Sequence, residues 1–338
     1  MLIINPTAGR ERAKYHKENL RRQLESMFDD VELRETEQAG DATLWAKEAA
    51  LIGFDAVFSM GGDGTLNETI NGLAQANKPI DFGFIPLGTI NDLARALNIP
   101  LHPEVAIDIL PRCKTVKVDI AKANDRYFIN IVAAGLISEA VSEVTIKEKT
   151  LFGSLAYFMK GFQALPKQHS YHFHIREGNG TDIHISSPLV AAMLTDSAGS
   201  FRNLVPPEER NKGLIKLALF HNFQWLRTIR EAPKLLTGLQ LGPEILTVVG
   251  VKKAHISISN EEELITNVDG EKGPSFPIDL EILPDRLSVF VPEKIKEDNS
   301  LFPHLLEGIQ PKLRLPWAES ADEDMERILM GEESLPLK

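Results

Sequence analysis

The first hundred residues alternate short apolar runs with longer segments of helical pattern. Apolar runs rich in β-branched and aromatic residues predict buried strands at residues 2–5, 31–34, 55–59 and 82–85. Helical patterns lie between and after them, at residues 10–27, 41–53, 66–76 and up to residue 97. Strands that alternate with helices of this length predict an α/β domain with a doubly wound parallel sheet.

Beyond about residue 115 the pattern changes to short, often alternating runs separated by turns. These runs predict strands at residues 116–120, 127–132, 171–175, 182–185, 189–194, 214–220, 254–259 and 278–283. Helical patterns interrupt them at about 149–165 and 223–238. We therefore expect a first domain at 1–118 and an antiparallel, β-sandwich-like second domain at 119–292, whose final strand or helix could return to the first domain. An acidic tail at 293–338 would follow.

Composition narrows the classes of function. The chain has 338 residues with 48 acidic and 37 basic side chains, and its net charge of −11 argues against nucleic acid as a partner. The single Cys113 rules out an internal disulfide and a cysteine-based metal site, and it favours a cytoplasmic location. No apolar run approaches the length of about 18 residues that a membrane-spanning helix needs, so we expect none.

Residues 59–68, Ser-Met-Gly-Gly-Asp-Gly-Thr-Leu-Asn-Glu, follow a predicted strand and open a predicted helix. Glycines at 61, 62 and 64 let the main chain approach an anion, and a helix N-terminus attracts negative charge. A carboxylate at Asp63 beside phosphates implies Mg²⁺ or a role in proton transfer. The alternative is a glycine turn with Asp63 as its cap. The stretch is neither a P-loop nor a dinucleotide fingerprint.

Two further loops follow predicted strands, one at Asn5 and one at residues 88–92. Ligands of parallel sheets bind at the carboxyl ends of the strands, so these loops and residues 61–65 are expected to gather there.

Residues 61–65 resemble the GGDGT motif of diacylglycerol, sphingosine and NAD kinases and phosphofructokinases. Three other stretches, Asn-Pro-Thr-Ala-Gly at 5–9, Pro-Leu-Gly-Thr-Ile-Asn-Asp-Leu-Ala-Arg at 86–95 and Asn-Val-Asp-Gly-Glu at 267–271, occur in the order and approximate spacing of the bacterial diacylglycerol kinase family. The resemblance is closest to its soluble Gram-positive members and runs from residue 1 to about 292. It does not cover the tail.

The resemblance implies an ATP site at the loops of the first domain. Its nucleotide-binding residues would be Asn5, Pro6, Thr7, Ala8, Gly9, Thr36, Gly61, Gly62, Asp63, Gly64, Thr65, Leu66, Asn67, Glu68, Gly88, Thr89 and Asn91. Several of them have a simpler interpretation: Asn5-Pro6 could only end a strand, Thr36 could only make a turn, and Asn91-Asp92 could only cap a helix.

The catalytic residues implied by the resemblance are Asp63 and Glu271. Asp63 and Asp92 would hold the catalytic Mg²⁺ through water. Glu271 would accept the proton of the substrate hydroxyl, because phosphoryl transfer to an alcohol needs a group that takes it. The chemistry would then lie between the two domains. Asp269-Gly270 alone could instead be only a hairpin turn.

The function implied is that of an ATP- and Mg²⁺-dependent lipid kinase that converts diacylglycerol into phosphatidic acid. Two alternatives stay open: a kinase of another lipid alcohol or of a soluble polyol, including NAD, and a catalytically silent nucleotide-binding regulator. The intact Asp63, Asp92 and Glu271 speak against the regulator. A homodimer is a candidate assembly.

Residues 151–162 are apolar nearly all round, with lysines at 147, 149, 160 and 167 nearby. They predict either a core helix or a wall that faces lipid, whose lysines meet an anionic membrane surface. With the second interpretation the protein is cytoplasmic and peripheral to the inner face of the membrane.

The loop at 209–214 departs from the family pattern. The resembled kinases carry Asp-Asp-Gly there and hold a structural Mg²⁺, whereas this chain has Asn211 and Lys212. An ammonium group removes a carboxylate ligand and repels the cation, so no metal is expected in this loop.

Overall fold

The computed structural model describes residues 1–89, 91–135, 170–194, 213–221, 246–259 and 263–293. They belong to one compact unit, Met1–Glu293. Several expectations fall outside them: the helices at 149–165 and 223–238, nearly all of the acidic tail, and residues 209–212 of the loop without a metal.

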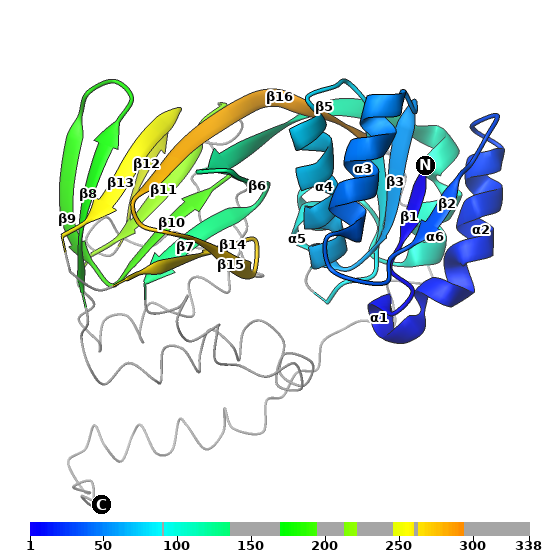
Figure 1. Cartoon of the computed structure of the whole chain (residues 1–338), viewed down its shortest axis with the longest axis horizontal. Helices are drawn as coiled ribbons and strands as arrows, with labels where there is room; N and C mark the ends of the chain where they lie inside the picture. The colour runs from blue at the N-terminus through cyan, green and yellow to red at the C-terminus, as the bar shows by residue number, and fades with distance from the viewer. Residues whose placement is uncertain (90, 136–169, 195–212, 222–245, 260–262, 294–338) are drawn as a thin grey trace, which may run out of the picture. The chain divides into compact units, whose positions relative to one another are not determined.

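The first domain has the predicted alternation of strands and helices. Its elements are β1 (Leu2–Ile4), α1 (Ala8–Glu11), α2 (Ala13–Glu25), β2 (Leu33–Glu35), α3 (Asp41–Ile52), β3 (Ala56–Gly61), α4 (Asp63–Ala76), β4 (Asp81–Pro86), α5 (Asp92–Ala96), α6 (Pro103–Asp108) and the 3₁₀ turn η1 (Leu110–Arg112). The strands pair in parallel in the order β2-β1-β3-β4. Helices α3 and α4 lie on one side of these strands and α2 and α6 on the other (Figure 1).

The single helix expected at residues 10–27 is wrong, because two helices occupy that stretch. Glu11 has φ of +68°, in the left-handed region. An L-residue in that conformation cannot continue a right-handed helix, so α1 ends there and α2 begins at Ala13. Leu20 and Leu24 of α2 are fully buried against the sheet core.

The second domain consists of antiparallel strands. They are β5 (Cys113–Ala123), β6 (Arg126–Phe128), β7 (Ile131–Gly135), β8 (Tyr171–Glu177), β9 (Asp182–Ser187), β10 (Leu189–Met193), β11 (Ile215–Phe220), β12 (Leu246–Val251), β13 (Lys253–Ile258), β14 (Ile265–Val268), β15 (Glu271–Ser275) and β16 (Ile278–Pro292). One sheet has the order β12-β11-β10-β7-β14-β15. Its buried residues share a core with Phe128, Phe173 and Ile256 of the other sheet. The predicted sandwich-like domain is confirmed.

Strand β16 belongs to the sheets of both domains. It pairs antiparallel with β13 and β5, and near its end Ser288 and Val289 pair in parallel with Asp81 and Phe82 of β4. The pairing with β5 shifts between Leu283 and Leu287. A single sheet therefore runs from the first domain into one layer of the sandwich (Figure 1).

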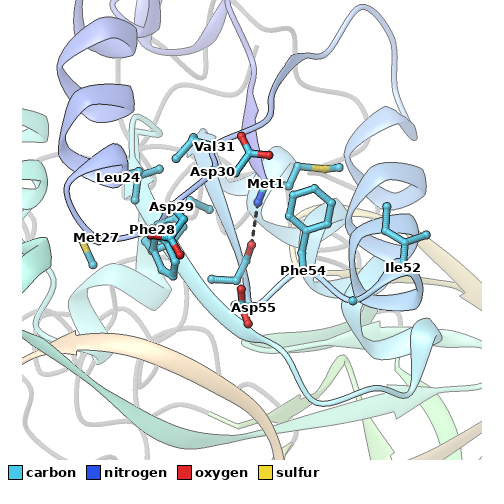
Figure 2. Close-up of a pocket in the computed structure, with 13 residues that line it drawn as sticks. Met1, Leu24, Met27, Phe28, Asp29, Asp30, Val31, Ile52, Phe54 and Asp55 are labelled. Carbon is cyan, nitrogen blue, oxygen red and sulfur yellow. Dashed lines mark hydrogen bonds between the residues drawn. The ribbon is translucent and has the colours of Figure 1, made fainter.

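A cavity of ≈ 460 Å³ lies at the amino ends of β1 and β3 (Figure 2). Apolar residues such as Leu24, Phe28 and Phe54 line it, together with the acidic Asp30 and Asp55. It is at the end of the parallel strands opposite to the loops that the sequence analysis selected. Within the described part of the chain, every helix is too short or too polar to cross a bilayer.

Candidate active site

Main-chain hydrogen bonds draw together the loops at the carboxyl ends of β1, β3 and β4. The N–H of Asn5 donates to Met60 O (3.0 Å), and the N–H of Leu87 donates to Gly61 O (2.8 Å). The side chain of Asn5 also reaches α4, where its Nδ2 donates to Thr65 Oγ1 (3.2 Å). The three loops that the sequence predicted to gather are therefore side by side.

Two glycines of this cluster are required by close approach. A Cβ at Gly61 would lie 2.5 Å from the Cβ of Thr65. A Cβ at Gly88 would lie 2.7 Å from Asp63 Oδ2 and 2.6 Å from Asn91 Oδ1. All three distances are far below van der Waals contact, so a side chain at either position would displace the neighbouring side chains.

Asp63 is held at the first turn of α4. Its Oδ2 accepts the N–H of Asn91 (3.3 Å). The amide of Asn91 in turn accepts the N–H of Gly88 and donates to Gly88 O, both at 2.9 Å. Asn91 has φ of +53°, which asparagine tolerates better than most residues, and Asp92 begins α5 directly after it. The main-chain N–H of Asn91 thus bridges the two loops that carry Asp63 and Asp92.

The described residues contain no cluster of three or more histidine, cysteine or acidic side chains that could hold a metal. Mg²⁺ does not need one, because it is usually bound by one or two carboxylates, several waters and the phosphates of a substrate. The carboxylates of Asp63 and Asp92, on adjacent loops, are oxygen donors of the required kind. The residues present therefore fit Mg²⁺ bound together with a nucleotide.

The other predicted nucleotide residues take different positions. The N–H and hydroxyl of Thr7 donate to Asn5 Oδ1 at 3.1 and 2.8 Å, and the N–H of Thr36 donates to Ile4 O at 2.8 Å. Gly9, with φ of +60°, lies against Leu87. The remaining predicted residues divide between exposed and buried positions: Pro6, Ala8, Gly62, Thr89 and Glu68 are partly or fully exposed, whereas Leu66 and Asn67 of α4 are buried.

Glu271 begins β15, directly after the turn of the β14–β15 hairpin. Both turn residues have positive φ, +48° at Asp269 and +91° at Gly270, as a two-residue hairpin of type I′ requires. Asn267 Oδ1 accepts the N–H of Gly270 (2.9 Å). The turn is thus fixed by its own residues.

The carboxylate of Asp269 attaches this turn to the segment between β6 and β7. It accepts three main-chain N–H groups, from Ile129 (2.9 Å), Asn130 (3.0 Å) and Ile131 (2.8 Å). Burial raises the pKa of Asp269 to about 6, although these three donors and the charge of Arg126 act in the opposite direction. The bonds also explain why residues 127–132 are not one strand: the N–H groups of residues 129–131 turn toward a side chain instead of a neighbouring strand.

Glu271 lies against the start of α4. A Cβ at Gly64 would be 3.5 Å from Glu271 Oε1. The other oxygen, Oε2, forms an ion pair with the guanidinium of Arg126. The structure therefore brings Glu271 of the second domain to the helix turn that carries Asp63.

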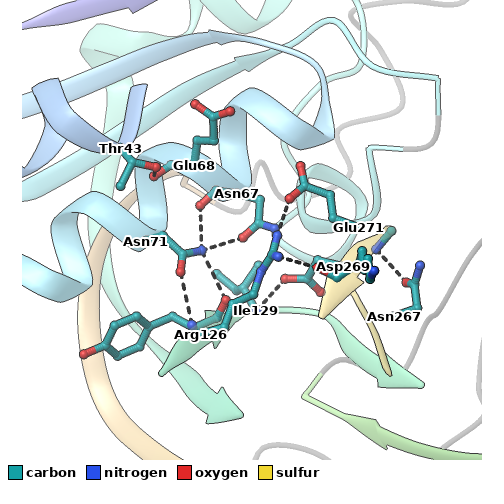
Figure 3. Close-up of polar contacts among 12 residues, drawn as sticks. Thr43, Asn67, Glu68, Asn71, Arg126, Ile129, Asn267, Asp269 and Glu271 are labelled. Atoms are coloured by element: carbon teal, nitrogen blue, oxygen red, sulfur yellow. Dashed lines mark hydrogen bonds and ion pairs between the residues drawn. The ribbon is translucent and has the colours of Figure 1, made fainter. Parts of the chain in front are cut away.

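Contacts that the sequence did not predict join α4 to β6 (Figure 3). The side-chain amide of Asn71 on α4 accepts the N–H of Tyr127 and donates to Tyr127 O, both at 3.1 Å. It also donates to Asn67 Oδ1 (2.7 Å). Arg126 is the residue next to Tyr127. In the sequence, the signal near these residues is the stretch Tyr-Phe-Ile-Asn at 127–130, which also looks like the bacterial diacylglycerol kinase family.

Comparison with known proteins places this geometry in a family. Residues 1–123 match the diacylglycerol kinase catalytic domain, and residues 130–291 match the YegS C-terminal NAD kinase beta sandwich-like domain. The chain is 35% identical to a diacylglycerol kinase of Bacillus subtilis (strain 168) over 88% of this chain and 97% of the relative. It is 34% identical to a diacylglycerol kinase of Staphylococcus carnosus (strain TM300), over 87% and 95%.

A solved structure of similar fold supports the same family. The crystal structure of a diacylglycerol kinase from Bacillus anthracis str. Sterne superposes with a TM-score of 0.73 at 25% identity, over 86% of this chain and 96% of that chain. The chain belongs to the diacylglycerol kinase family. It is an enzyme, a kinase, and ATP is its phosphoryl donor. The predicted family, fold class and kinase activity are thereby confirmed.

Proposed function

We propose that this kinase transfers the γ-phosphoryl group of ATP to the primary hydroxyl of diacylglycerol and releases phosphatidic acid and ADP. The observation that carries the proposal is the position of Glu271, whose Oε1 faces Gly64 at the start of α4. A carboxylate at the N-terminus of a phosphate-binding helix repels the phosphates, which is unfavourable for binding. Its position is explained if the carboxylate accepts a proton during the reaction.

The phosphates of ATP bind at the first turn of α4. The helix dipole and the N–H groups of this turn favour negative charge, and Gly62 and Gly64 leave the main chain open to it. Asn5 and Thr65 hold the neighbouring loop against this turn through their side-chain hydrogen bond. The loop and the helix turn are thereby held in one arrangement, and a preformed site lowers the entropic part of the barrier.

Mg²⁺ is proposed as the cofactor, with Asp63 and Asp92 as its protein ligands through water. When bound, the cation neutralises the charge that accumulates on the phosphoryl oxygens. Glu271 accepts the proton of the substrate hydroxyl while the oxygen of that hydroxyl attacks the γ-phosphorus. The bond between that phosphorus and the β–γ bridging oxygen breaks, and the bridging oxygen leaves with ADP.

Phosphorylation of a panel of alcohols with radiolabelled ATP tests the proposal. The panel contains diacylglycerol, monoacylglycerol and sphingosine in anionic mixed micelles, and NAD in solution. We expect labelled phosphatidic acid from diacylglycerol and loss of the product without Mg²⁺. Preferred labelling of sphingosine or NAD would replace the proposed substrate, and no labelling of any acceptor would mean that the kinase acts on an alcohol outside this panel.

We further propose that the enzyme works peripherally on the anionic inner face of the membrane, where its substrate is found. Electrostatic contacts with lipid headgroups are screened over a Debye length of about 8 Å at physiological ionic strength. In vesicle sedimentation, binding to anionic vesicles should exceed binding to neutral ones and weaken as salt rises. Equal binding to both kinds of vesicle at low salt would contradict a charged membrane contact.

The expected absence of a structural Mg²⁺ at residues 209–214 stays a prediction, because only Gly213 and Leu214 of this loop are described. A crystal grown in Mg²⁺ tests it. An ion at about 2.1 Å from oxygens of this loop would contradict the prediction, and Lys212→Asp is the change expected to create a site there.

A further inference from the structure

Arg126 makes two contacts with the arm of the hairpin that carries Glu271. Its Nη1 donates to the main-chain oxygen of Lys272 (2.6 Å), and its Nη2 pairs with Glu271 Oε2. One guanidinium therefore binds both the main chain of the arm and its acidic side chain. The planar fork of an arginine can fix two acceptors at once, which a lysine ammonium cannot do with the same geometry.

The two oxygens of Glu271 face different groups. Oε2 points to Arg126, and Oε1 points to Gly64 at the start of α4. When one oxygen of a carboxylate is held, the direction of the other is restricted. The side chains of Arg126 and Glu271 are 30% and 43% exposed, and an isolated ion pair at such exposure is weakly ordered. The additional bond to Lys272 O is what makes this pair directional.

Arg126 is itself tied to the phosphate-binding helix. The next residue, Tyr127, has its N–H and its main-chain oxygen both bonded to the amide of Asn71, in the middle of α4 (Figure 3). This two-bond contact fixes the start of β6 relative to the helix. A continuous path thus runs from Asn71 of α4 to Tyr127, along the main chain to Arg126, and from there to Glu271.

We propose that Arg126 is a positioning residue that holds Glu271 Oε1 toward the phosphate-binding end of α4, and that Asn71 fixes Arg126 in that role. The inference rests on the proposed function, in which Glu271 accepts the proton. Proton transfer requires the base within hydrogen-bond reach of the hydroxyl, and a displacement of about 1 Å can cost on the order of 10²-fold in rate.

Kinetics of Arg126→Met and Arg126→Lys test this role, with Arg286→Met as the matched control. Arg286 also contacts α4, but at Ala74, about 15 Å along the helix from Gly64 at 1.5 Å per residue. We expect kcat of Arg126→Met to fall on the order of 10²-fold with an unchanged KM for ATP. Arg126→Lys should recover part of this loss, and Arg286→Met should keep the kcat of the wild type.

A double-variant cycle separates positioning from a general structural role. Once Glu271→Gln has removed the base, Arg126→Met should have little further effect on the residual rate. Losses that add in the double variant would overturn the proposal, and so would a wild-type kcat in Arg126→Met. A raised KM for ATP with an unchanged kcat would overturn it too, because Arg126 would then bind the nucleotide.

Hydrogen exchange of the unliganded protein tests the anchoring without any substrate. Peptides that cover residues 265–275 should exchange about 10-fold faster in Arg126→Met and in Asn71→Leu than in the wild type, because the contacts that hold the arm are lost. Unchanged exchange in both variants would overturn the inference. Failure of the wild-type enzyme to make phosphatidic acid would instead refute the proposed function, and the exchange measurement would still decide the role of Arg126.

Discussion

The two ends of helix α4 are each contacted by the second half of the chain, but by opposite charges. At the N-terminal end, the carboxylate of Glu271 faces Gly64. At the C-terminal end, Arg286 of β16 donates to Ala74 O (2.8 Å) and to the side-chain oxygen of Asn77. An acidic side chain thus lies at the first turn of the helix, and a basic side chain lies at its last turn.

The dipole of the helix explains this distribution. The last turn of a helix exposes unpaired carbonyl groups and a partial negative charge. Arg286 donates a hydrogen bond to one of these carbonyl groups, and its positive charge interacts favourably with the helix dipole. The first turn attracts anions, and under the proposed function the phosphates of ATP occupy it. Glu271 would then lie beside them, and Arg126 is the cation that pairs with it. We therefore expect the C-terminal contact to serve stability and, under the proposed function, the N-terminal contact to serve chemistry.

The largest expected effect is at the N-terminal end. Asp63→Ala and Glu271→Ala should each lower turnover by at least about 10²-fold, roughly 3 kcal/mol of barrier, while the fold stays intact. Steady-state phosphorylation of diacylglycerol measures the loss, and circular dichroism checks the fold. Activity near that of the wild type in either variant would remove that residue from the mechanism.

Gly88→Ala probes the same end without altering a charged group. The added methyl group would lie 2.7 Å from Asp63 Oδ2, so the carboxylate must move away from the N–H of Asn91. We expect a loss of turnover of about 10- to 10²-fold and weaker binding of ATP. Titration with a fluorescent ATP analogue measures binding. Unchanged affinity and rate would show that the position of Asp63 is not critical.

Asp269, in the turn that precedes Glu271, makes the stability of the protein depend on pH. Its pKa is raised to about 6 from the ordinary 3.8, so its stabilising contribution is complete below the lower value and is lost as pH rises through about 6. The free energy of unfolding of the wild type, relative to Asp269→Asn, should fall by about 2 kcal/mol between pH 4 and 6.5. Urea denaturation at several pH values measures the difference. A difference that grows with pH would mean that the three N–H donors outweigh burial.

Much of this architecture could be predicted from the sequence, because the parallel strands are continuous apolar runs. Among the strands of the described residues, the sequence did not predict β12, β14 and β15. The residues of β15, Glu-Lys-Gly-Pro-Ser, include types that are depleted in strands, and the strand exists because the type I′ turn returns the chain along β14. The conformation of such a segment is determined by its pairing with a neighbouring strand and not by the strand preference of its own residues.

The site was predictable only where a motif marks it. Asn5, Asp63 and Asn91 lie in loops that the motifs and the parallel sheet bring together. Asn71 and Tyr127 meet through a side-chain amide and a main-chain peptide 56 positions apart, a contact that leaves no periodic trace in the sequence. Arg126 and Glu271 are 145 positions apart, and the sequence around either residue does not predict their ion pair.

The smallest effect is expected at the C-terminal end of α4. Arg286→Met should lower the free energy of unfolding by about 1 to 2 kcal/mol, because the charged hydrogen bond to Ala74 O and the favourable interaction with the helix dipole are lost. Since a methionine keeps most of the apolar stem of arginine, packing along the helix changes little. In a chain of this size the melting temperature should fall by only a few degrees, on the order of 2 to 4 °C per kcal/mol, and turnover below that temperature should stay unchanged. Differential scanning calorimetry and kinetics on one preparation measure both quantities. A loss of turnover without a loss of stability would mean that the two ends of the helix do not divide stability and chemistry between them.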